Sequence, residues 1–288
     1  MILAAILITL LILYVLLAMY LASYVMKIDR KTLEESLAWQ TAHYDTSYYA
    51  DLKKTDYAVT MNDGYILHVQ LLENPKPVTD YVIITHGYTD NRMEDLKYAK
   101  MYLDLGYNCV IYDLRGHGEN EPTYTTYGIR EGEDLNCLIA DTRKRYPDLT
   151  SLGLHGESLG SATTITCLKY HPEVDFAVAD CGFSDIENVL KGMAPGFIID
   201  IANTGAKLKY RHAIKDMRPI DALDDNEVPV LFIHGADDEL ISPKNSEDMS
   251  KRTKGRSEFH IIPGAKHAVS IIVEPEMYAD IVRNFLGK

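Results

Sequence analysis

The hydrophobic pattern divides the chain into an apolar N-terminal segment and a longer body of mixed composition. Among residues 1–26 only Thr9 and Ser23 are polar, and none is charged. As a helix this segment would extend on the order of 39 Å, which exceeds the roughly 30 Å hydrocarbon core of a bilayer. We therefore predict an uncleaved transmembrane helix over 1–26. A cleaved signal peptide and a buried core helix are the alternatives, although the run is long for a signal peptide and no basic residue precedes it.

Basic residues flank only the C-terminal end of this segment. Lys27, Arg30 and Lys31 follow it, and no Lys or Arg precedes it. The positive-inside rule then favours a single-pass membrane protein with a cytoplasmic body, and an extracytoplasmic body is the alternative.

Beyond the apolar segment, short β-branched runs alternate with longer amphipathic stretches. Residues 27–54 are polar and predict a connector with one or two helical turns around 32–39, and residues 55–288 predict one domain. The expected strands of this domain are Ile66–Leu72, Tyr81–Thr85, Cys109–Asp113, Ser151–His155, Phe176–Ala179, Val230–Ile233 and Phe259–Ile262. The expected helices are Asp95–Leu105, Glu131–Arg145, Leu159–Tyr170, Lys244–Lys251 and Glu276–Phe285.

The expected strands are continuously apolar rather than alternating, which indicates burial on both faces of a sheet. Strands that alternate with helices predict an α/β fold with a doubly wound, mostly parallel sheet. One interval departs from this rhythm, because the stretch between Ala179 and Val230 is longer than an ordinary connection. Its apolar residues, which include Phe183, Met193 and Ile199, predict a helical lid over about 183–226.

Composition and charge exclude several classes of function. The body carries the whole formal charge of −13, and no nucleic-acid partner is expected because phosphate binding is built from clustered Lys and Arg. The four cysteines are too few and too widely spaced for a disulfide framework or a zinc site. We expect Cys109, Cys137, Cys167 and Cys181 to pack as small hydrophobic residues.

The candidate nucleophile is Ser158, in the sequence GESLG at 156–160. This G-x-S-x-G pattern follows a buried strand and opens a helix, and that strand–turn–helix context is what the pattern requires in a nucleophile elbow. The flanking glycines allow a tight turn that exposes the serine hydroxyl.

A serine hydroxyl needs an adjacent base, and the base needs an orienting carboxylate. On this type of sheet the acid and then the histidine follow the serine in the chain. Three histidines follow the strand Val230–Ile233. We predict that His267 is the base, because it lies in a loop after the last strand, whereas His260 lies within that strand and His234 precedes any acid in its loop.

The acid is expected in the loop after Val230–Ile233. Asp237, Asp238 and Glu239 are adjacent there, and their distance from the strand does not separate them.

At this point the chain resembles the α/β-hydrolase superfamily, in its serine-hydrolase branch of bacterial esterases, monoacylglycerol-lipase-like and serine-aminopeptidase-like enzymes. The likeness covers about residues 57–286. It depends on HGY at 86–88, DLRGHG at 113–118, GESLG at 156–160, and HGADDELI at 234–241 with His267 downstream. The family pattern H-G-x-x-D-x-x-V-P maps the acid to Asp238. Because Ile241 replaces the Val and the Pro is displaced to Pro243, Asp237 stays the alternative.

The resemblance also implies an oxyanion hole made by the backbone N–H groups of Tyr88 and Leu159. The helix that begins at Leu159 adds the positive end of its dipole. For Arg115 and His117, in the loop at 113–118, we expect structural roles.

The resemblance implies a serine hydrolase that cleaves carboxylic esters through an acyl-enzyme, with no cofactor and no metal ion. Its expected partners are a small acyl ester or a short peptide and, through the N-terminal helix, a membrane. A serine peptidase of the aminopeptidase-like type is the alternative. A non-enzymatic binding protein on the same fold is a further alternative, which the complete Ser, Asp and His set disfavours. The sequence does not indicate an oligomeric state.

Overall fold

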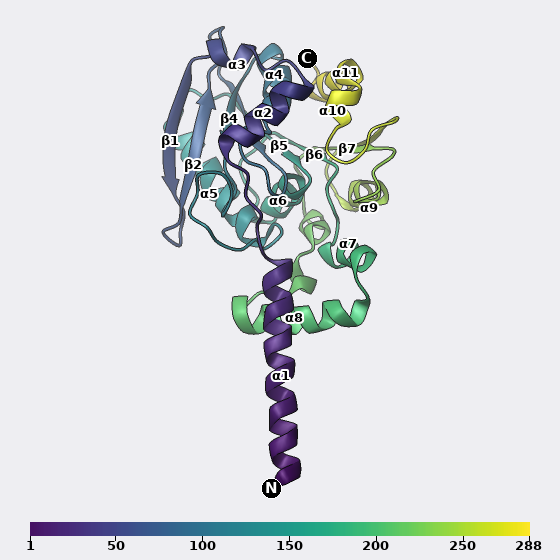
Figure 1. Cartoon of the computed structure of the whole chain (residues 1–288). Coiled ribbons are helices and arrows are strands. Elements are labelled where there is room, and N and C mark those ends of the chain that lie inside the picture. Colours follow the sequence, from purple (N-terminus) through teal and green to yellow (C-terminus); the bar gives the residue numbers. More distant parts are fainter.

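A computed structural model describes residues 1–288, and its centre is one eight-stranded sheet with helices on both faces (Figure 1). The strands are β1 (Lys54–Thr60), β2 (Ile66–Leu72), β3 (Asp80–Thr85), β4 (Tyr107–Tyr112), β5 (Ser151–Glu157), β6 (Phe176–Asp180), β7 (Val230–Gly235) and β8 (Ser257–Ile262). Their order across the sheet is β1-β2-β4-β3-β5-β6-β7-β8. All pairs from β4 to β8 are parallel, and β2 is antiparallel to both β1 and β4.

The helices are α1 (Ile2–Val25), α2 (Leu33–His43), α3 (Tyr48–Asp51), α4 (Leu96–Asp104), α5 (Ile129–Arg145), α6 (Leu159–Cys167), α7 (Ile186–Met193), α8 (Gly196–Tyr210), α9 (Lys244–Arg252), α10 (Ser270–Val273) and α11 (Pro275–Leu286). Short 3₁₀ turns are η1 (Leu168–Tyr170), η2 (Ile214–Asp216) and η3 (Pro219–Leu223). This is the doubly wound α/β-hydrolase fold that the sequence predicts.

The sheet separates two hydrophobic cores, as the continuously apolar strands require. Successive residues of β3 point to opposite faces, so Ile83 belongs to the core beneath α5 and α6, whereas Val82 and Ile84 belong to the core beneath α4 and α11. Every residue of β4 and β7 is buried. The parallel strands bring the carboxyl ends of β3, β5, β6 and β7 to one edge of the sheet, where the loops that bear the candidate residues begin.

Two elements near the start of the body, β1 and α2, differ from the sequence-based expectation. Strand β1 begins at Lys54 and was not among the expected strands, because it is an edge strand in which only Val59 is fully buried. Helix α2 is longer than one or two turns. Its start is fixed by a capping box, in which Thr32 Oγ1 accepts from the Glu35 N–H and Glu35 Oε2 accepts from the Thr32 N–H.

The long interval between β6 and β7 is helical, and contains α7, α8, η2 and η3. Figure 1 shows α8 lying across α1 on the side of the molecule from which α1 projects. Helix α1 is one apolar helix long enough to span a membrane, with a mean hydropathy of 3.0 and 6% of its most apolar window buried. Composition and length of this kind fit a membrane span and also a signal sequence.

Candidate active site

Ser158 lies in the sharp turn between β5 and α6, with a left-handed φ of 53°. The flanking glycines are required by close backbone contacts. A Cβ on Gly156 would lie 2.1 Å from the Gly160 carbonyl oxygen, and a Cβ on Gly160 would lie 1.9 Å from the Thr85 carbonyl oxygen. The turn holds Ser158 in a conformation that costs of order 1–3 kcal/mol and is common at functional sites.

The structure brings Ser158, His267 and Asp238 together from three loops. His267 Nε2 lies 2.9 Å from Ser158 Oγ, and His267 Nδ1 lies 2.7 Å from Asp238 Oδ2. Because Nδ1 faces a carboxylate, it carries the ring hydrogen, and Nε2 is left to accept a proton from the serine hydroxyl. The Asp238 side chain is fully buried and that of His267 is 20% exposed.

Asp238 is held by more partners than His267 alone. Its Oδ1 accepts from the backbone N–H groups of Leu240 (3.0 Å) and Ile241 (2.9 Å), and its Oδ2 also lies 3.1 Å from His234 Nε2. Burial alone would raise the pKa of Asp238, but the hydrogen bonds from His234 and His267 outweigh it and hold the pKa well below its usual range. The carboxylate is therefore ionised at neutral pH.

The neighbouring candidates lie elsewhere. The Asp237 side chain is exposed and makes no hydrogen bond. His260 lies in β8, with its Nε2 3.3 Å from Glu258. His234 is fully buried and bridges Asp238 to Ser246, whose Oγ lies 2.7 Å from His234 Nδ1. His234 therefore contacts the Asp238 carboxylate and does not contact the serine.

Tyr88 and Leu159 flank the serine. A Cβ on Gly87, the residue before Tyr88, would lie 3.6 Å from Ser158 Cβ, so the loop after β3 adjoins the serine. The Tyr88 N–H donates no hydrogen bond within the chain, and Leu159 is the first residue of α6. Both amides are therefore in positions where they can serve as donors to an anion next to Ser158.

Arg115 and His117 are buried in contacts that stabilise their loop. The Arg115 guanidinium binds Asp134 of α5 bidentately, at 2.8 and 2.5 Å, and reaches Asp63 at 2.9 Å. Burial, and then the nearby His86 ring, lower the pKa of His117 to about 3, so its ring is neutral at physiological pH. These contacts agree with the structural roles expected from the sequence.

A buried charged network beneath the serine was not predicted. Lys97 Nζ lies 2.5 Å from Glu157, the residue before Ser158, and donates to the Ala268 carbonyl at 3.0 Å, next to His267. Burial, and then the charge of Glu157, raise the pKa of the neighbouring Glu94 to about 8. Lys97 thus joins the loop of Ser158 to the loop of His267. The sequence signal was a lysine on the otherwise apolar face of α4.

Other side chains complete this network. The Tyr98 hydroxyl lies within hydrogen-bond distance of Glu157 and, at 2.9 Å, of Asp180, and Tyr278 donates to Asp180 at 3.0 Å. Burial raises the pKa values of Glu157 and Asp180 above their usual range. The ion pair with Lys97 opposes this shift at Glu157.

Replacing Lys97 with methionine should therefore destabilise the fold by about 3–5 kcal/mol, because it leaves the Glu157 carboxylate buried without its ion-pair partner. The folded-state pKa of Glu157 is already raised. The protonated Glu157 carboxyl stabilises the fold fully when the pH is below the pKa that Glu157 has in the unfolded chain. This stabilisation is lost as the pH rises through the higher pKa that Glu157 has in the folded protein. The loss in Lys97→Met should thus be greater at mildly alkaline than at mildly acidic pH, as measured by denaturant unfolding in detergent.

The matched control is Lys100→Met on the same helix. Lys100 pairs with Asp104 at 2.5 Å, but the two side chains are 50% and 65% exposed. Exposed pairs contribute about 0–1 kcal/mol, so this variant should unfold almost as wild type does. Equal losses in the two variants would contradict a specific role for the buried pair.

The four cysteines are free, and three of them are fully buried. One, Cys181, forms with Asp238 and His267 a group whose possible metal-ligand atoms lie within 4.8 Å of one another. Burial raises the pKa of the Cys181 thiol, so it is protonated at neutral pH and is a poor metal ligand. Asp238 and His267 are already paired with each other, so this group does not favour a metal ion.

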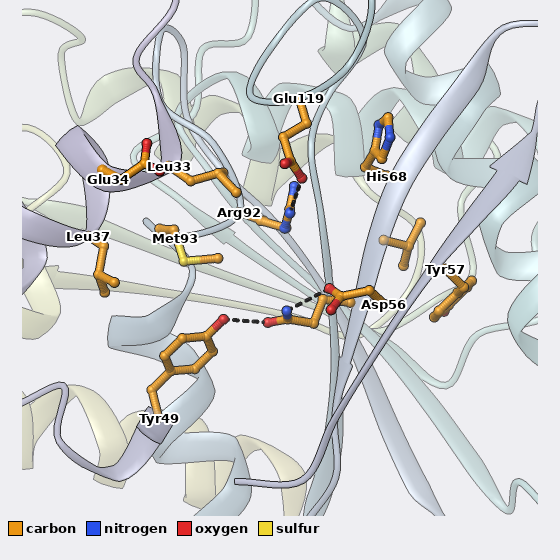
Figure 2. Close-up of a pocket in the computed structure, with 12 residues that line it drawn as sticks. Leu33, Glu34, Leu37, Tyr49, Asp56, Tyr57, His68, Arg92, Met93 and Glu119 are labelled. Carbon is orange, nitrogen blue, oxygen red and sulfur yellow. Dashed lines mark hydrogen bonds and ion pairs between the residues drawn. The ribbon is translucent and has the colours of Figure 1, made fainter. Parts of the chain in front are cut away.

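A cavity of about 600 Å³ lies away from these residues, between α2, β1 and β2 (Figure 2). Ser158, Asp238 and His267 do not line it. In its wall Gln70 accepts from Tyr49 at 2.8 Å and donates to Asp56 at 2.7 Å, and Arg92 binds Glu119 (Figure 2).

Sequence comparisons identify relatives over most of the chain. A protein of Bacillus subtilis, YqkD, is 30% identical over 276 residues, covering 91% of this chain and 89% of its own length. A membrane protein of Saccharomyces cerevisiae, YNL320W, is 27% identical over 191 residues, covering 64% of this chain and 62% of its own. Both are described as uncharacterized proteins.

Solved structures share the fold. The esterase Pf2001 of Pyrococcus furiosus superposes with a TM-score of 0.70 at 22% identity, covering 91% of this chain and 97% of its own. Est1E of Butyrivibrio proteoclasticus, solved with ferulic acid bound, has a TM-score of 0.66 at 19% identity, covering 80% of this chain and 97% of its own. The sequence profile of the prolyl oligopeptidase family matches residues 94–284. The chain is therefore an α/β hydrolase that belongs to the prolyl oligopeptidase family.

Proposed function

We propose that the protein is a serine hydrolase that cleaves carboxylic esters of modest size. The proposal is supported above all by the continuous hydrogen-bonded series from Asp238 through His267 to Ser158. In this scheme His267 Nε2 takes the hydroxyl proton as Ser158 Oγ attacks the ester carbonyl. The N–H groups of Tyr88 and Leu159 stabilise the oxyanion that develops.

The acyl-enzyme is then hydrolysed by water. His267 returns its proton to the leaving alkoxide, so the alcohol departs and Ser158 stays acylated. In the second half His267 removes a proton from water and the resulting hydroxide attacks the acyl carbon. The bond between that carbon and Ser158 Oγ then breaks, His267 returns the proton to Oγ, and the carboxylic acid leaves. Throughout, Asp238 holds the Nδ1–H of His267 and stabilises the imidazolium. No cofactor is required for either half-reaction.

Aromatic rings extend from the loop next to the serine to the interval between β6 and β7. The Tyr88 ring lies 6.1 Å from that of Tyr127, which in turn lies 6.5 Å from that of Phe183, at the start of the interval between β6 and β7. We propose that this interval is a lid whose apolar residues contact the acyl chain. The names of Pf2001 and Est1E, as an esterase and a ferulic acid complex, point to the same class of substrate.

Cleavage of a peptide amide is the second candidate, and the specific observation that favours it is the match to a family named for an oligopeptidase. The same Ser158 and His267 chemistry applies, because only the leaving group differs. The body is proposed to be anchored at a membrane by α1, on the cytoplasmic side if Lys27, Arg30 and Lys31 determine its orientation.

A fluorophosphonate probe tests the nucleophile. The wild-type protein should be labelled covalently, and Ser158→Ala should not be, because the probe reacts with an activated serine hydroxyl. Ser161→Ala, three residues further along α6, is the matched control and should label as wild type does, since Ser161 makes no hydrogen bond with the series. Absence of wild-type labelling would exclude a serine hydrolase.

Turnover then separates the two substrate classes. We expect p-nitrophenyl acyl esters to be cleaved faster than aminoacyl anilides. Faster anilide cleavage, with labelling still dependent on Ser158, would establish the peptidase alternative.

A further inference from the structure

Helix α8 presents an apolar face that the body does not cover. Phe197, Ile201, Thr204 and Leu208 are spaced four, three and four residues apart, so they lie on one side of the helix. Phe197 is 65% exposed and Leu208 is 58% exposed, and Met193, just before α8, is 65% exposed. An exposed cluster of this kind marks a surface that contacts another apolar phase.

The opposite face of α8 holds it against the body and α1. Ile199, Ala202 and Ala206 are buried. A Cβ on Gly205 would lie 1.9 Å from the carbonyl oxygen of Ala18, so the backbones of α8 and α1 touch at this point. Close crossings through small residues of this kind are frequent where membrane helices meet. Lys209 Nζ also donates to Ser23 Oγ at 2.5 Å, which fixes α8 to the C-terminal part of α1.

The exposed face is turned toward the N-terminal part of α1. The Tyr14 hydroxyl donates to Thr204 Oγ1 at 3.4 Å, and Tyr14 lies one helical turn closer to the N-terminus than Ala18. Figure 1 shows α1 continuing past α8 and away from the sheet. Phe197, Ile201 and Leu208 therefore face whatever phase surrounds this end of α1.

The length of α1 indicates that the phase around its N-terminal part is lipid. The segment that precedes the crossing, Ile2–Leu17, is about 24 Å long as a helix. A hydrocarbon core of roughly 30 Å requires about 20 residues. The apolar run of α1 continues through the crossing at Ala18 as far as Val25, so an α1 that spans the bilayer has lipid around it up to the crossing. At that depth the bilayer surface reaches α8.

The charges around α8 fit the same position. Lys207 and Arg211 are exposed near its C-terminal end, and Lys209 lies between them. Basic side chains beside an apolar face extend toward lipid headgroups while the apolar residues enter the acyl region.

We propose that α8 is an interfacial helix, which lies in the surface of the bilayer that α1 spans and places Met193, Phe197, Ile201 and Leu208 among the lipid chains. The partner of this surface is the bilayer itself. The inference does not depend on the reaction that Ser158 performs. It brings the segment between β6 and β7 into contact with lipid close to the candidate active site.

Tryptophan fluorescence in the full chain tests the depth of α8. The protein has one tryptophan, Trp39, so the background is Trp39→Phe. In this background Phe197→Trp and Leu208→Trp are placed near the two ends of the face, Leu10→Trp reports insertion of α1, and Met277→Trp, 40% exposed on α11, is the matched exposed control. Each variant is reconstituted into phosphatidylcholine vesicles with bromine in the upper part of the acyl chains.

We expect Phe197→Trp and Leu208→Trp to lose most of their emission to bromine quenching and to emit at shorter wavelength than Met277→Trp, which should not be quenched. Quenching of Leu10→Trp without quenching at either α8 position would overturn the proposal, because α1 would then span the bilayer with α8 clear of it. Quenching at only one end would also contradict a helix lying in the surface. A blue shift without quenching would indicate a second protein copy on this face and would equally reject it. Far-UV circular dichroism of each variant, compared with the Trp39→Phe background, shows that the fold is retained.

Discussion

Replacing His267 with alanine is expected to lower kcat for ester hydrolysis by a factor of about 10⁴ to 10⁶. His267 is the one side chain in contact with both Ser158 Oγ and Asp238, at 2.9 and 2.7 Å. Without it the hydroxyl has no adjacent base, and the leaving alkoxide has no proton donor. The measurement is the initial rate of p-nitrophenyl ester cleavage by the full-length protein in detergent.

The matched control is His260→Ala. His260 lies in β8 and contacts Glu258 rather than the serine, so its removal should leave kcat within a few-fold of wild type and lower stability only partly. Binding of substrate depends mainly on groups other than His267, so KM should change far less than kcat in His267→Ala. Comparable losses of kcat in both variants would remove the basis for choosing His267 as the base.

The alternation of apolar strands and amphipathic helices was sufficient to predict the fold. Buried parallel strands such as β4 and β7 carry a continuous apolar signal because both of their faces are covered. Strand β1 escaped prediction because it lies at the sheet edge, where four of its seven residues are polar and one residue is buried. The pattern of apolar residues along a sequence reflects which residues are buried. An edge strand with few buried residues therefore has only a weak apolar pattern.

The candidate site was predictable for a related reason. The positions of Ser158 and His267 follow from local rules, namely a glycine-flanked turn after a strand and a loop after the last strand. Lys97 obeys no such rule, because its partner Glu157 is brought to it by the packing of α4 on the sheet. The choice between Asp237 and Asp238 also depended on three-dimensional direction: adjacent residues of one loop point to opposite sides, one to solvent and one to His267.

The contact between α1 and α8 shows the limit of prediction from the sequence. Ala18 and Ala22 are small residues in one segment, and Gly205 is a small residue in a segment far along the chain. The sequence around each of them does not indicate that the two segments are in contact. Only the structure shows that Ala18 and Gly205 meet backbone to backbone. It also shows that Met26, at the end of α1, is fully buried in the core of the body. The C-terminal part of the apolar segment, from Ala18 to Met26, is therefore packed against the body.

Asp238→Asn is expected to lower kcat by about 10⁴, through the tautomer of His267 rather than through loss of structure. Asp238 Oδ1 accepts from the N–H groups of Leu240 and Ile241, so an asparagine at this position must keep its carbonyl oxygen there and turn its amide NH₂ toward His267. A donor facing Nδ1 forces the ring hydrogen onto Nε2, which then cannot accept the Ser158 proton. The same rotation places NH₂ against the Nε2–H of His234, so a modest loss of stability should accompany the loss of rate.

Asp237→Asn is the control that makes this test specific. It removes the same charge one residue away, from an exposed side chain without a hydrogen bond, so kcat and the denaturant midpoint should both stay close to wild type. Labelling of Asp238→Asn by the fluorophosphonate should slow in parallel with ester turnover, because both require deprotonation of Ser158 by His267. If Asp237→Asn were the more damaging variant, the acid would be Asp237, and the loop would have to turn by one residue in solution to bring that side chain to His267.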